Sequence, residues 1–257
     1  MAFSFTVLGS GSKGNACVIA SSRTRLLLDC GFSRRELTAR LRYAGLDPAQ
    51  LDAILITHEH SDHVAGLPRF AAATAAPVWL TPATRAALGP AGEKLERVEA
   101  FAAGFTFTIG DIEVTPFTVP HDAADPVAFS FRAEGLRAVI VTDLGSLTAN
   151  VCDQLRAADA AVIESNHDLE MLKTGGYPWA LKQRVLSRVG HLSNDTLAEF
   201  LATAFDGAAR HLVLAHLSEN NNLPALARLS AQRALAGRHA PTLHLASQST
   251  PLPTIAL

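Results

Sequence analysis

One short segment, THEHSDH, places four side chains that can bind metal ions within six residues. They are His58, His60, Asp62 and His63. Alternate residues share a face in an extended chain but point roughly 200° apart on a helix, so His58 and His60 can reach one ion only from extended backbone. If a helix then starts near Val64, Asp62 and His63 project toward a second ion. Imidazole and carboxylate groups at this spacing are typical ligands of zinc-like ions. A metal site therefore explains the segment better than a solvated histidine-rich loop does.

Five short apolar runs each lead into a polar side chain that can do chemistry. The five side chains are Asp29, His58, Asp143, Glu164 and His216. Leucine-rich and β-branched runs of this length are typical of buried strands. Functional groups at the carboxyl ends of strands in α/β proteins converge on one crevice. The sequence therefore predicts an α/β fold that gathers these groups at one site.

The intervening sequence predicts helices and one antiparallel region. Helices are expected over Arg34–Ala44, Val64–Thr74, Asn150–Ala157, Leu181–Val189, Asp195–Phe205 and Leu223–Ala236. Asn194 and Asp195 are the candidate N-cap residues of the fifth helix. Residues 105–132 resemble antiparallel strands with a turn at Gly110–Asp111. With no repeat and no long linker, the prediction is a single domain over residues 1–257.

The glycine-rich loop near the start, GSGSKG, matches a dinucleotide-binding fingerprint when Asp29 is counted as its acidic partner. That fingerprint needs a helix directly after the glycines, because the helix N-terminus holds the pyrophosphate. Residues 15–29 instead predict strand, short turn and strand. We therefore interpret the loop as a hairpin connection whose backbone N–H groups could line an anion site.

Composition limits the class of protein. The chain has 257 residues, 48% hydrophobic residues and a net charge of −2, which gives no general attraction to nucleic acid or anionic membranes. The opening MAFSFTVLGSGSK has no basic residue before Lys13, so it predicts a first strand rather than a secretory signal. No stretch approaches the ~20 apolar residues of a membrane span. Three dispersed cysteines are typical of reduced thiols in a cytoplasmic protein.

The HxHxDH pattern after a strand resembles the metallo-β-lactamase superfamily. This resemblance implies a four-layer αββα sandwich with two metal ions at one edge of its sheets. It also implies three further ligands. His121 would complete the first metal site with His58 and His60, and His216 would join Asp62 and His63 at the second. Asp143 would bridge the two ions, so the implied cofactors are two divalent ions, zinc first, with manganese or iron as alternatives.

Particular residues separate the branches of this superfamily. His60 stands where flavodiiron enzymes have glutamate, and Asp143 where true β-lactamases of this fold generally carry cysteine. The short span from Asp143 to His216 leaves no room for the extra domain of β-CASP nucleases. The motifs GSGSKGNA, THEHSDHVAGL, ESNHDLEML, GYPWALKQRVLSRVGHLSN and LAHLSENNN are similar to the YycJ/WalJ-type family, although Cys30 stands where alanine is more usual. That similarity implies a cytoplasmic 5′-to-3′ DNA exonuclease.

The resemblance implies a mechanism and roles for individual residues. A hydroxide bridging the ions would attack phosphorus, and Asp62 would orient it and accept its proton. By similarity to ribonuclease Z, His191 and Glu164 are the candidate proton-donating pair at the leaving group. The candidate substrate-binding residues are Ser12, Lys13, Asn15, His167, Lys182 and Arg184. For His167, contact with metal, contact with substrate and a structural role all stay open.

Local charge provides modest support for a polyanionic substrate. The stretch from Met171 to Asn194 has several cationic residues and no acidic one. A second stretch, from Arg34 to Arg42, is rich in arginine and contains a single glutamate. Such patches bind phosphate backbones, and a solvated helix face explains them equally well. Tyr177 and Trp179 in the first stretch are candidates to stack on bases, with ordinary packing as the alternative.

Three other functions remain open. A thioester hydrolase of the glyoxalase II type uses the same ligands, but the C-terminal region shows no clear glutathione-binding equivalent. A small cyclic phosphodiesterase would share the chemistry and differ only in substrate. A regulatory binding module with a degenerate site is the non-enzymatic alternative, and the presence of all seven ligands argues against it.

Overall fold

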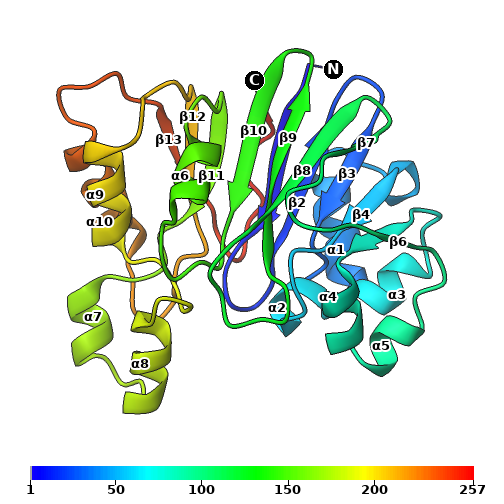
Figure 1. Ribbon diagram of the computed structural model, residues 1–257, viewed down its shortest axis with the longest axis horizontal. Coiled ribbons are helices and arrows are strands. Elements are labelled where there is room, and N and C mark those ends of the chain that lie inside the picture. Colours follow the sequence, from blue (N-terminus) through cyan, green and yellow to red (C-terminus); the bar gives the residue numbers. More distant parts are fainter. Residues whose placement is uncertain (1) are drawn as a thin grey trace. The chain divides into compact units, whose positions relative to one another are not determined.

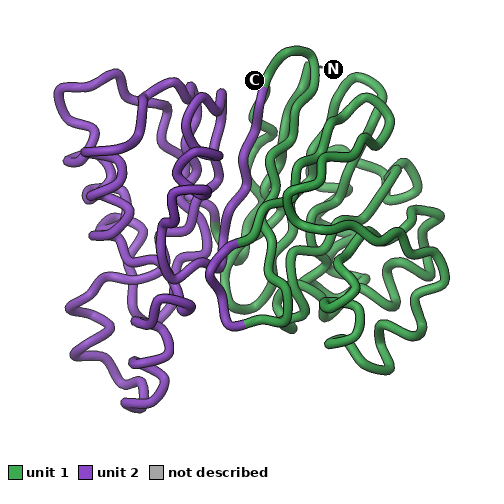
Figure 2. The backbone as a smooth tube through the Cα atoms, in the orientation of Figure 1, with its two compact units in different colours: residues 1–118, 123–136, 247–257 green, residues 119–122, 137–246 purple. Residues whose placement is uncertain are grey.

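The computed structural model describes residues 2–257, which divide into two compact units coloured separately in Figure 2. Unit 1 contains the chain up to Thr118 together with Ala123–Leu136 and Ser247–Leu257. Unit 2 contains Val119–Asp122 and Arg137–Ala246. The expectation of a single domain over residues 1–257 stays a prediction.

Unit 1 is built on a seven-stranded sheet (Figure 1). Its strands, in spatial order, are β14 (Ile255–Ala256), β1 (Ser4–Gly9), β2 (Ala16–Ala20), β3 (Arg25–Leu28), β4 (Ala53–Leu55), β5 (Val78–Leu80) and β6 (Val98–Ala100). Strands β3 to β6 run parallel, whereas β14, β1, β2 and β3 pair antiparallel. Because β3 and β4 are parallel neighbours, the side chains that follow them emerge at the same edge of the sheet.

Helices cover one face of this sheet. They are α1 (Arg34–Tyr43), the 3₁₀ helix η1 (Pro48–Gln50), α2 (Ser61–Val64), α3 (Leu67–Ala71), α4 (Pro82–Ala87) and α5 (Pro90–Glu93). Leu37 of α1 and Phe70 of α3 belong to the same buried core as Ile54 of β4. The helix expected over Val64–Thr74 is instead broken at Gly66, where an added Cβ would lie 1.9 Å from the carbonyl oxygen of Phe32.

The antiparallel region of unit 1 is confirmed. It comprises β7 (Phe107–Ile109), β8 (Ile112–Thr118) and β9 (Val127–Ala133), with the predicted turn at Gly110–Asp111. Asp111 accepts hydrogen bonds from the hydroxyls of Ser21 and Thr24, each at 2.6 Å, which ties this turn to the β2–β3 loop. These hydrogen bonds, chiefly that from Ser21, lower the pKa of Asp111 to about 2.

Unit 2 contains four parallel strands, β10 (Leu136–Val141), β11 (Ala160–Glu164), β12 (His211–Ala215) and β13 (Thr242–Leu245), the first of which begins at the last residue of a unit 1 segment. Its helices are α6 (Ala149–Leu155), α7 (Leu169–Thr174), α8 (Trp179–Leu186), α9 (Asn194–Thr203) and α10 (Pro224–Ala234). Strand β11 is buried along its whole length, as its run of apolar residues predicts. In Figure 1, α7 and α8 lie beyond the end of β11 where Glu164 stands, apart from α9 and α10.

The strand predictions are confirmed, and several helix boundaries are corrected. All five apolar runs form strands, and the GSGSKG loop is followed by β2, an antiparallel neighbour of β1, and not by a helix. The N-cap of α9 is Ser193, whose hydroxyl accepts from the N–H of Thr196, so the assignment to Asn194 and Asp195 was wrong. The short helices α4, α5 and α7 were not predicted. None of the helices described here is long and apolar enough to cross a membrane.

Candidate metal centre

In unit 1 the THEHSDH segment starts as extended chain and enters α2 at Ser61, as the ligand argument requires. The ring centroids of His58 and His60 lie 4.7 Å apart, and those of His58 and His63 lie 4.1 Å apart. Nε2 of His63 lies 3.5 Å from Oδ2 of Asp62, which stands beside it on α2. All four predicted ligands of this segment therefore cluster at the end of β4.

Buried hydrogen bonds fix the ring of His63. Its Nδ1 lies 2.8 Å from Oδ2 of Asp29, the residue that follows β3, and both side chains are at most 5% exposed. Thr57 holds the same carboxylate with its backbone N–H at 2.9 Å and its hydroxyl at 3.0 Å. The Thr57 hydroxyl also lies 3.0 Å from Nδ1 of His58. Holding Nδ1 of each ring would leave Nε2 to bind a metal ion, the usual arrangement around ligating histidines.

Asn15 and Gly31 fix the backbone at Asp62. The side-chain amide of buried Asn15 lies 3.2 Å from Oδ2 of Asp62 and 3.0 Å from Nε2 of His63, and its backbone N–H donates to the Asp62 carbonyl oxygen at 2.7 Å. Gly31 passes so close that a Cβ there would lie 1.7 Å from that carbonyl oxygen. Asn15, expected to touch substrate, thus lies among the predicted ligands.

Replacing Gly31 by alanine is expected to lower metal content and turnover together, because the added Cβ must push the Asp62 backbone away from its position. We expect a loss of metal affinity of roughly 10-fold or more, the size seen when groups supporting metal ligands are removed. Gly176→Ala is the matched control, since a Cβ there meets nothing within 4 Å. Metal analysis of both purified variants checks the prediction, and an unchanged Gly31→Ala protein would contradict it.

Unit 2 contributes a second set of predicted ligands. Oδ1 of Asp143 lies 3.9 Å from Nε2 of His121 and 3.4 Å from Nε2 of His216, and all three residues are at most 6% exposed. Nδ1 of His121 lies 3.1 Å from the carbonyl oxygen of Gly190. The three ligands that the family resemblance implied are therefore brought together within this unit.

Glu164 holds two histidines in unit 2. Its Oε1 lies 2.8 Å from Nδ1 of His191 and 3.0 Å from Nδ1 of His216, while Oε2 accepts the backbone N–H groups of Leu144 and Leu192. This carboxylate is fully buried, and four nitrogen groups lie within hydrogen-bond distance of it. His191 differs, because 20% of its side chain is exposed.

The two partners of this pair shift each other's pKa in opposite directions. Burial alone would raise the pKa of Glu164 and lower that of His191. Their mutual attraction and hydrogen bond outweigh burial, so the pKa of Glu164 falls well below its usual value and that of His191 rises above it. The buried contact therefore favours the charged forms of both groups, the carboxylate of Glu164 and the protonated ring of His191.

Three of the polar residues that follow strands have left-handed backbone. The φ angles of Asp29, Asp143 and His216 are 63°, 57° and 54°. Residues other than glycine seldom adopt this region, and strained backbone of this kind gathers at functional sites. Three candidate site residues thus share this uncommon backbone conformation.

A buried network of asparagines was not predicted. The amide of Asn166 donates to the His216 carbonyl oxygen at 2.8 Å, and Asn222 donates to the carbonyl oxygens of Ser165 and Asn166 at 2.9 and 3.0 Å. Asn194 accepts from the Ser165 hydroxyl at 2.7 Å. These residues hold the chain on either side of His216. The signal that could have found them is the density of asparagines in ESNH, HLSN and SENNN.

The candidate substrate-binding residues have varied surroundings. Ser12 and Lys13 are exposed at the tip of the glycine-rich loop, but several N–H groups of that loop donate to protein oxygens, including Lys13 N to Oε1 of Gln248 at 2.8 Å. Lys182 donates to the carbonyl oxygen of Lys173. Arg184 makes two hydrogen bonds to the carboxylate of Asp122, at 2.5 and 3.2 Å. Their roles stay predictions.

His167 is 1% exposed, and its Nδ1 lies 3.3 Å from Oδ1 of Asn166. Burial lowers the pKa of His167 to about 4, so the ring is neutral at physiological pH. Of the three roles left open for this residue, none is singled out by these contacts.

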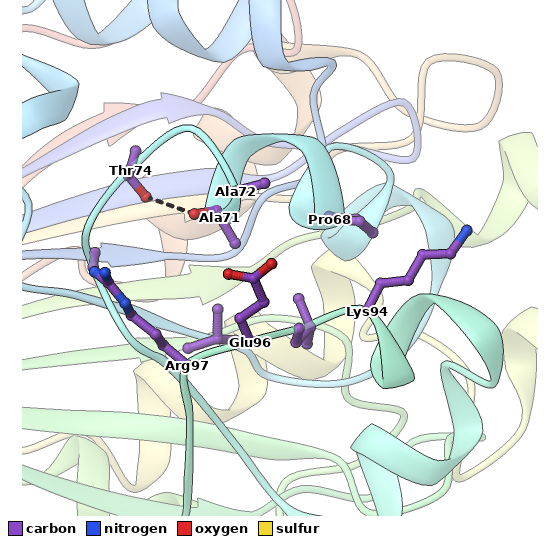
Figure 3. A pocket seen from close by; sticks show the side chains of 10 residues that line it. Pro68, Ala71, Ala72, Thr74, Lys94, Glu96 and Arg97 are labelled. Carbon is purple, nitrogen blue, oxygen red and sulfur yellow. Dashed lines mark hydrogen bonds between the residues drawn. The ribbon is translucent and has the colours of Figure 1, made fainter.

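Unit 1 also has a small pocket away from the predicted ligands (Figure 3). It lies between α3 and the segment before β6, and its volume is about 90 Å³. The carboxylate of Glu96 points toward Ala71 and Ala72, while the ammonium group of Lys94 points away from these two alanines (Figure 3). Ligand pockets usually measure roughly 300–1,000 Å³, so this one suits only a few water molecules.

Solved structures share the fold. The metallo-β-lactamase fold protein YhfI from Bacillus subtilis matches with a TM-score of 0.75 and 19% identity, over 97% of this chain and 99% of that one. The short form of human tRNase Z matches with a TM-score of 0.66 and 18% identity, over 97% and 98%. These likenesses confirm the predicted α/β, four-layer αββα metallo-β-lactamase fold.

Sequence relatives are closer. The exodeoxyribonuclease YycJ of Bacillus anthracis is 38% identical over 91% of this chain and 90% of its own length. The exodeoxyribonuclease WalJ of Streptococcus pneumoniae is 37% identical over 91% and 88%. Residues 24–217 match the model of the beta-lactamase superfamily domain. With this agreement over nearly the whole chain, the protein belongs to the metallo-β-lactamase superfamily and, within it, to the family of YycJ and WalJ.

Proposed function

We propose that this protein is a dinuclear metal-dependent phosphodiesterase that degrades DNA from a 5′ end. The observation that carries the proposal is the pair of ligand clusters. In each cluster, Nδ1 atoms of the histidine rings lie within hydrogen-bond distance of carboxylate, hydroxyl or carbonyl oxygens. The proposed ligands are His58, His60 and His121 for one ion, Asp62, His63 and His216 for the other, and Asp143 as the bridge.

The donor atoms within each unit fit a zinc-like ion. Ligands about 2.1 Å from a tetrahedral ion lie about 3.4 Å from one another. His63 Nε2 and Asp62 Oδ2 are 3.5 Å apart, and His216 Nε2 and Asp143 Oδ1 are 3.4 Å apart. Imidazole and carboxylate donors suit zinc, manganese and iron, and zinc is our first choice. When bound, the ions supply an activated water and neutralise charge that develops on the phosphate.

The protein's own residues divide the remaining work. Asp62 holds the attacking water by its carboxylate and takes up its proton. His191 donates a proton to the leaving oxygen, and its partial exposure gives it access to substrate. Glu164 is a positioning residue, since its two oxygens are occupied by His191, His216 and two backbone N–H groups. In this proposal His191 is the proton donor and Glu164 orients it, within the pair that the family resemblance implied.

The choice of DNA rests on the relatives, two of which are named exodeoxyribonucleases. Exposed Ser12 and Lys13 are the proposed contacts of the terminal phosphate. We also propose that the protein acts in the cytoplasm, where its three free cysteines would stay reduced.

End-labelled single- and double-stranded DNA and RNA, incubated with the purified protein and added zinc or manganese, test this proposal. Nucleotides should be released stepwise from the 5′ end of DNA, and a chelator should stop the release. S-lactoylglutathione and a cyclic nucleotide serve as rival substrates in parallel reactions. Faster turnover of either rival, or release from RNA alone, would overturn the proposal.

A further inference from the structure

The structure separates the two aromatic residues that precede and begin α8. The ring of Tyr177 is half-buried, and its hydroxyl accepts a hydrogen bond from the amide of Asn220 at 3.2 Å. Trp179 is 69% exposed. Tyr177 therefore ties the α7–α8 connection to the loop after His216, whereas packing inside the protein does not explain Trp179.

The face around Trp179 is mixed, with one cation, one amide and one apolar side chain, Leu186, which is 41% exposed. At 100° per residue, Lys182, Gln183 and Leu186 project within about 60° of Trp179 on α8. The stretch from Met171 to Asn194 contains no acidic residue, and Glu170 just before it pairs with Lys173 at 2.9 Å. In the ion pairs of the described residues, Lys173 and Arg184 are matched by carboxylates, so Lys182 and Arg188 supply the excess positive charge of this stretch, which favours an anionic partner.

Helix α8 is fixed beside the proposed catalytic groups of unit 2. The backbone N–H of His191 donates to the carbonyl oxygen of Val185 at 3.0 Å, and Arg184 binds Asp122, the neighbour of His121. Trp179 lies five residues before Arg184, which is about 8 Å along a helix. Along the axis of α8, Trp179 thus lies less than two turns from Val185, the residue that holds the His191 backbone.

We infer that Trp179 stacks on a base of a single-stranded segment of DNA, close to the bond that is cleaved. Exposed aromatic rings among cations are the usual platform for single-stranded nucleic acid, because every base offers a π-face while cations follow the phosphates. This inference rests on the proposed function and names the form of substrate that the site would hold. It assigns Lys182, the cation on the same face of α8, to a neighbouring phosphate.

Fluorescence of a single tryptophan gives a direct test. The chain has two tryptophans, and Trp79→Phe leaves Trp179 as the only emitter. That change is mild, because the ring stacks on Phe107 at 4.6 Å and its Nε1 has no hydrogen-bond partner among the described residues. A short phosphorothioate oligothymidylate, which resists cleavage, should quench the emission. An abasic strand of equal length should bind through its phosphates without quenching.

The affinity of variants completes the experiment. Trp179→Ala should weaken binding of the oligothymidylate roughly 10-fold, as loss of one stacked base does. Trp179→Phe should retain most of the affinity. Phe105→Ala is the matched control, since this phenylalanine is 73% exposed on unit 1 and should not matter.

The possible failures can be told apart. If the wild type neither binds nor cleaves DNA, the proposed function fails. If it cleaves DNA while Trp179 emission and the affinity of Trp179→Ala stay unchanged, only the stacking inference is overturned. A Trp179→Ala variant that changes sedimentation mass but not affinity also overturns it, and would assign this face to self-association.

Discussion

The His60→Ala protein is expected to lose bound metal and turnover together. His60 is the N-cap residue of α2, but its side chain makes no capping hydrogen bond there. The substitution therefore removes no helix cap. Removing an imidazole ligand should reduce the metal content from two ions per chain. The metal-supplied stabilisation of the transition state is worth several kcal/mol, so turnover should fall by roughly 10³-fold or more.

Metal analysis, circular dichroism and the DNA release assay check this result on one preparation. His239→Ala is the control, because His239 is exposed and follows no strand. A folded His60→Ala protein with full metal content and normal turnover would contradict the ligand assignment.

The second large effect concerns the two partners of the buried pair. His191→Ala should keep both metal ions while turnover falls by roughly 10²–10⁴-fold, the contribution of a positioned proton donor. Glu164→Gln should lower turnover and also weaken metal binding by roughly 10–100-fold. The difference arises because Glu164 orients His216 as well as His191, and an amide in its place sets one donor against other donors.

Metal affinity and turnover are measured on both variants under the same conditions. The prediction depends on the contrast between them. If His191→Ala releases metal as fully as Glu164→Gln does, His191 is a metal ligand, and the proton donor must be sought elsewhere.

The local features of the fold that come from short-range patterns were predictable. Short, continuous apolar runs such as those before Asp29 and Glu164 bury both faces when they form interior strands, and all five runs form strands. The helix expected over Val64–Thr74 failed because Pro68 has no N–H for a helical hydrogen bond, and it stands instead in the first turn of the separate helix α3. Short helices such as α7 carry too few turns to give a periodic signal.

The candidate site was likewise predictable only in part. Residues that are recognised by their type and by their position at the end of a strand, such as His58 and His216, could be proposed from the sequence. The supporting contacts could not, because a resemblance or a motif does not tell whether Asn15 faces substrate or holds Asp62. Likewise, only the folded chain shows that Glu164 is enclosed by four donors.

The left-handed backbone at Asp29, Asp143 and His216 has a consequence for engineering. Glycine or asparagine is more comfortable in that region, and relief of such strain is worth about 1–3 kcal/mol at each position. A substitution there must be judged against the buried hydrogen bonds that the native side chain makes, such as those of Asp29 with Thr57 and His63. Heat tolerance and metal content should be measured together on such variants, because relief of strain and loss of hydrogen bonds act in opposite directions.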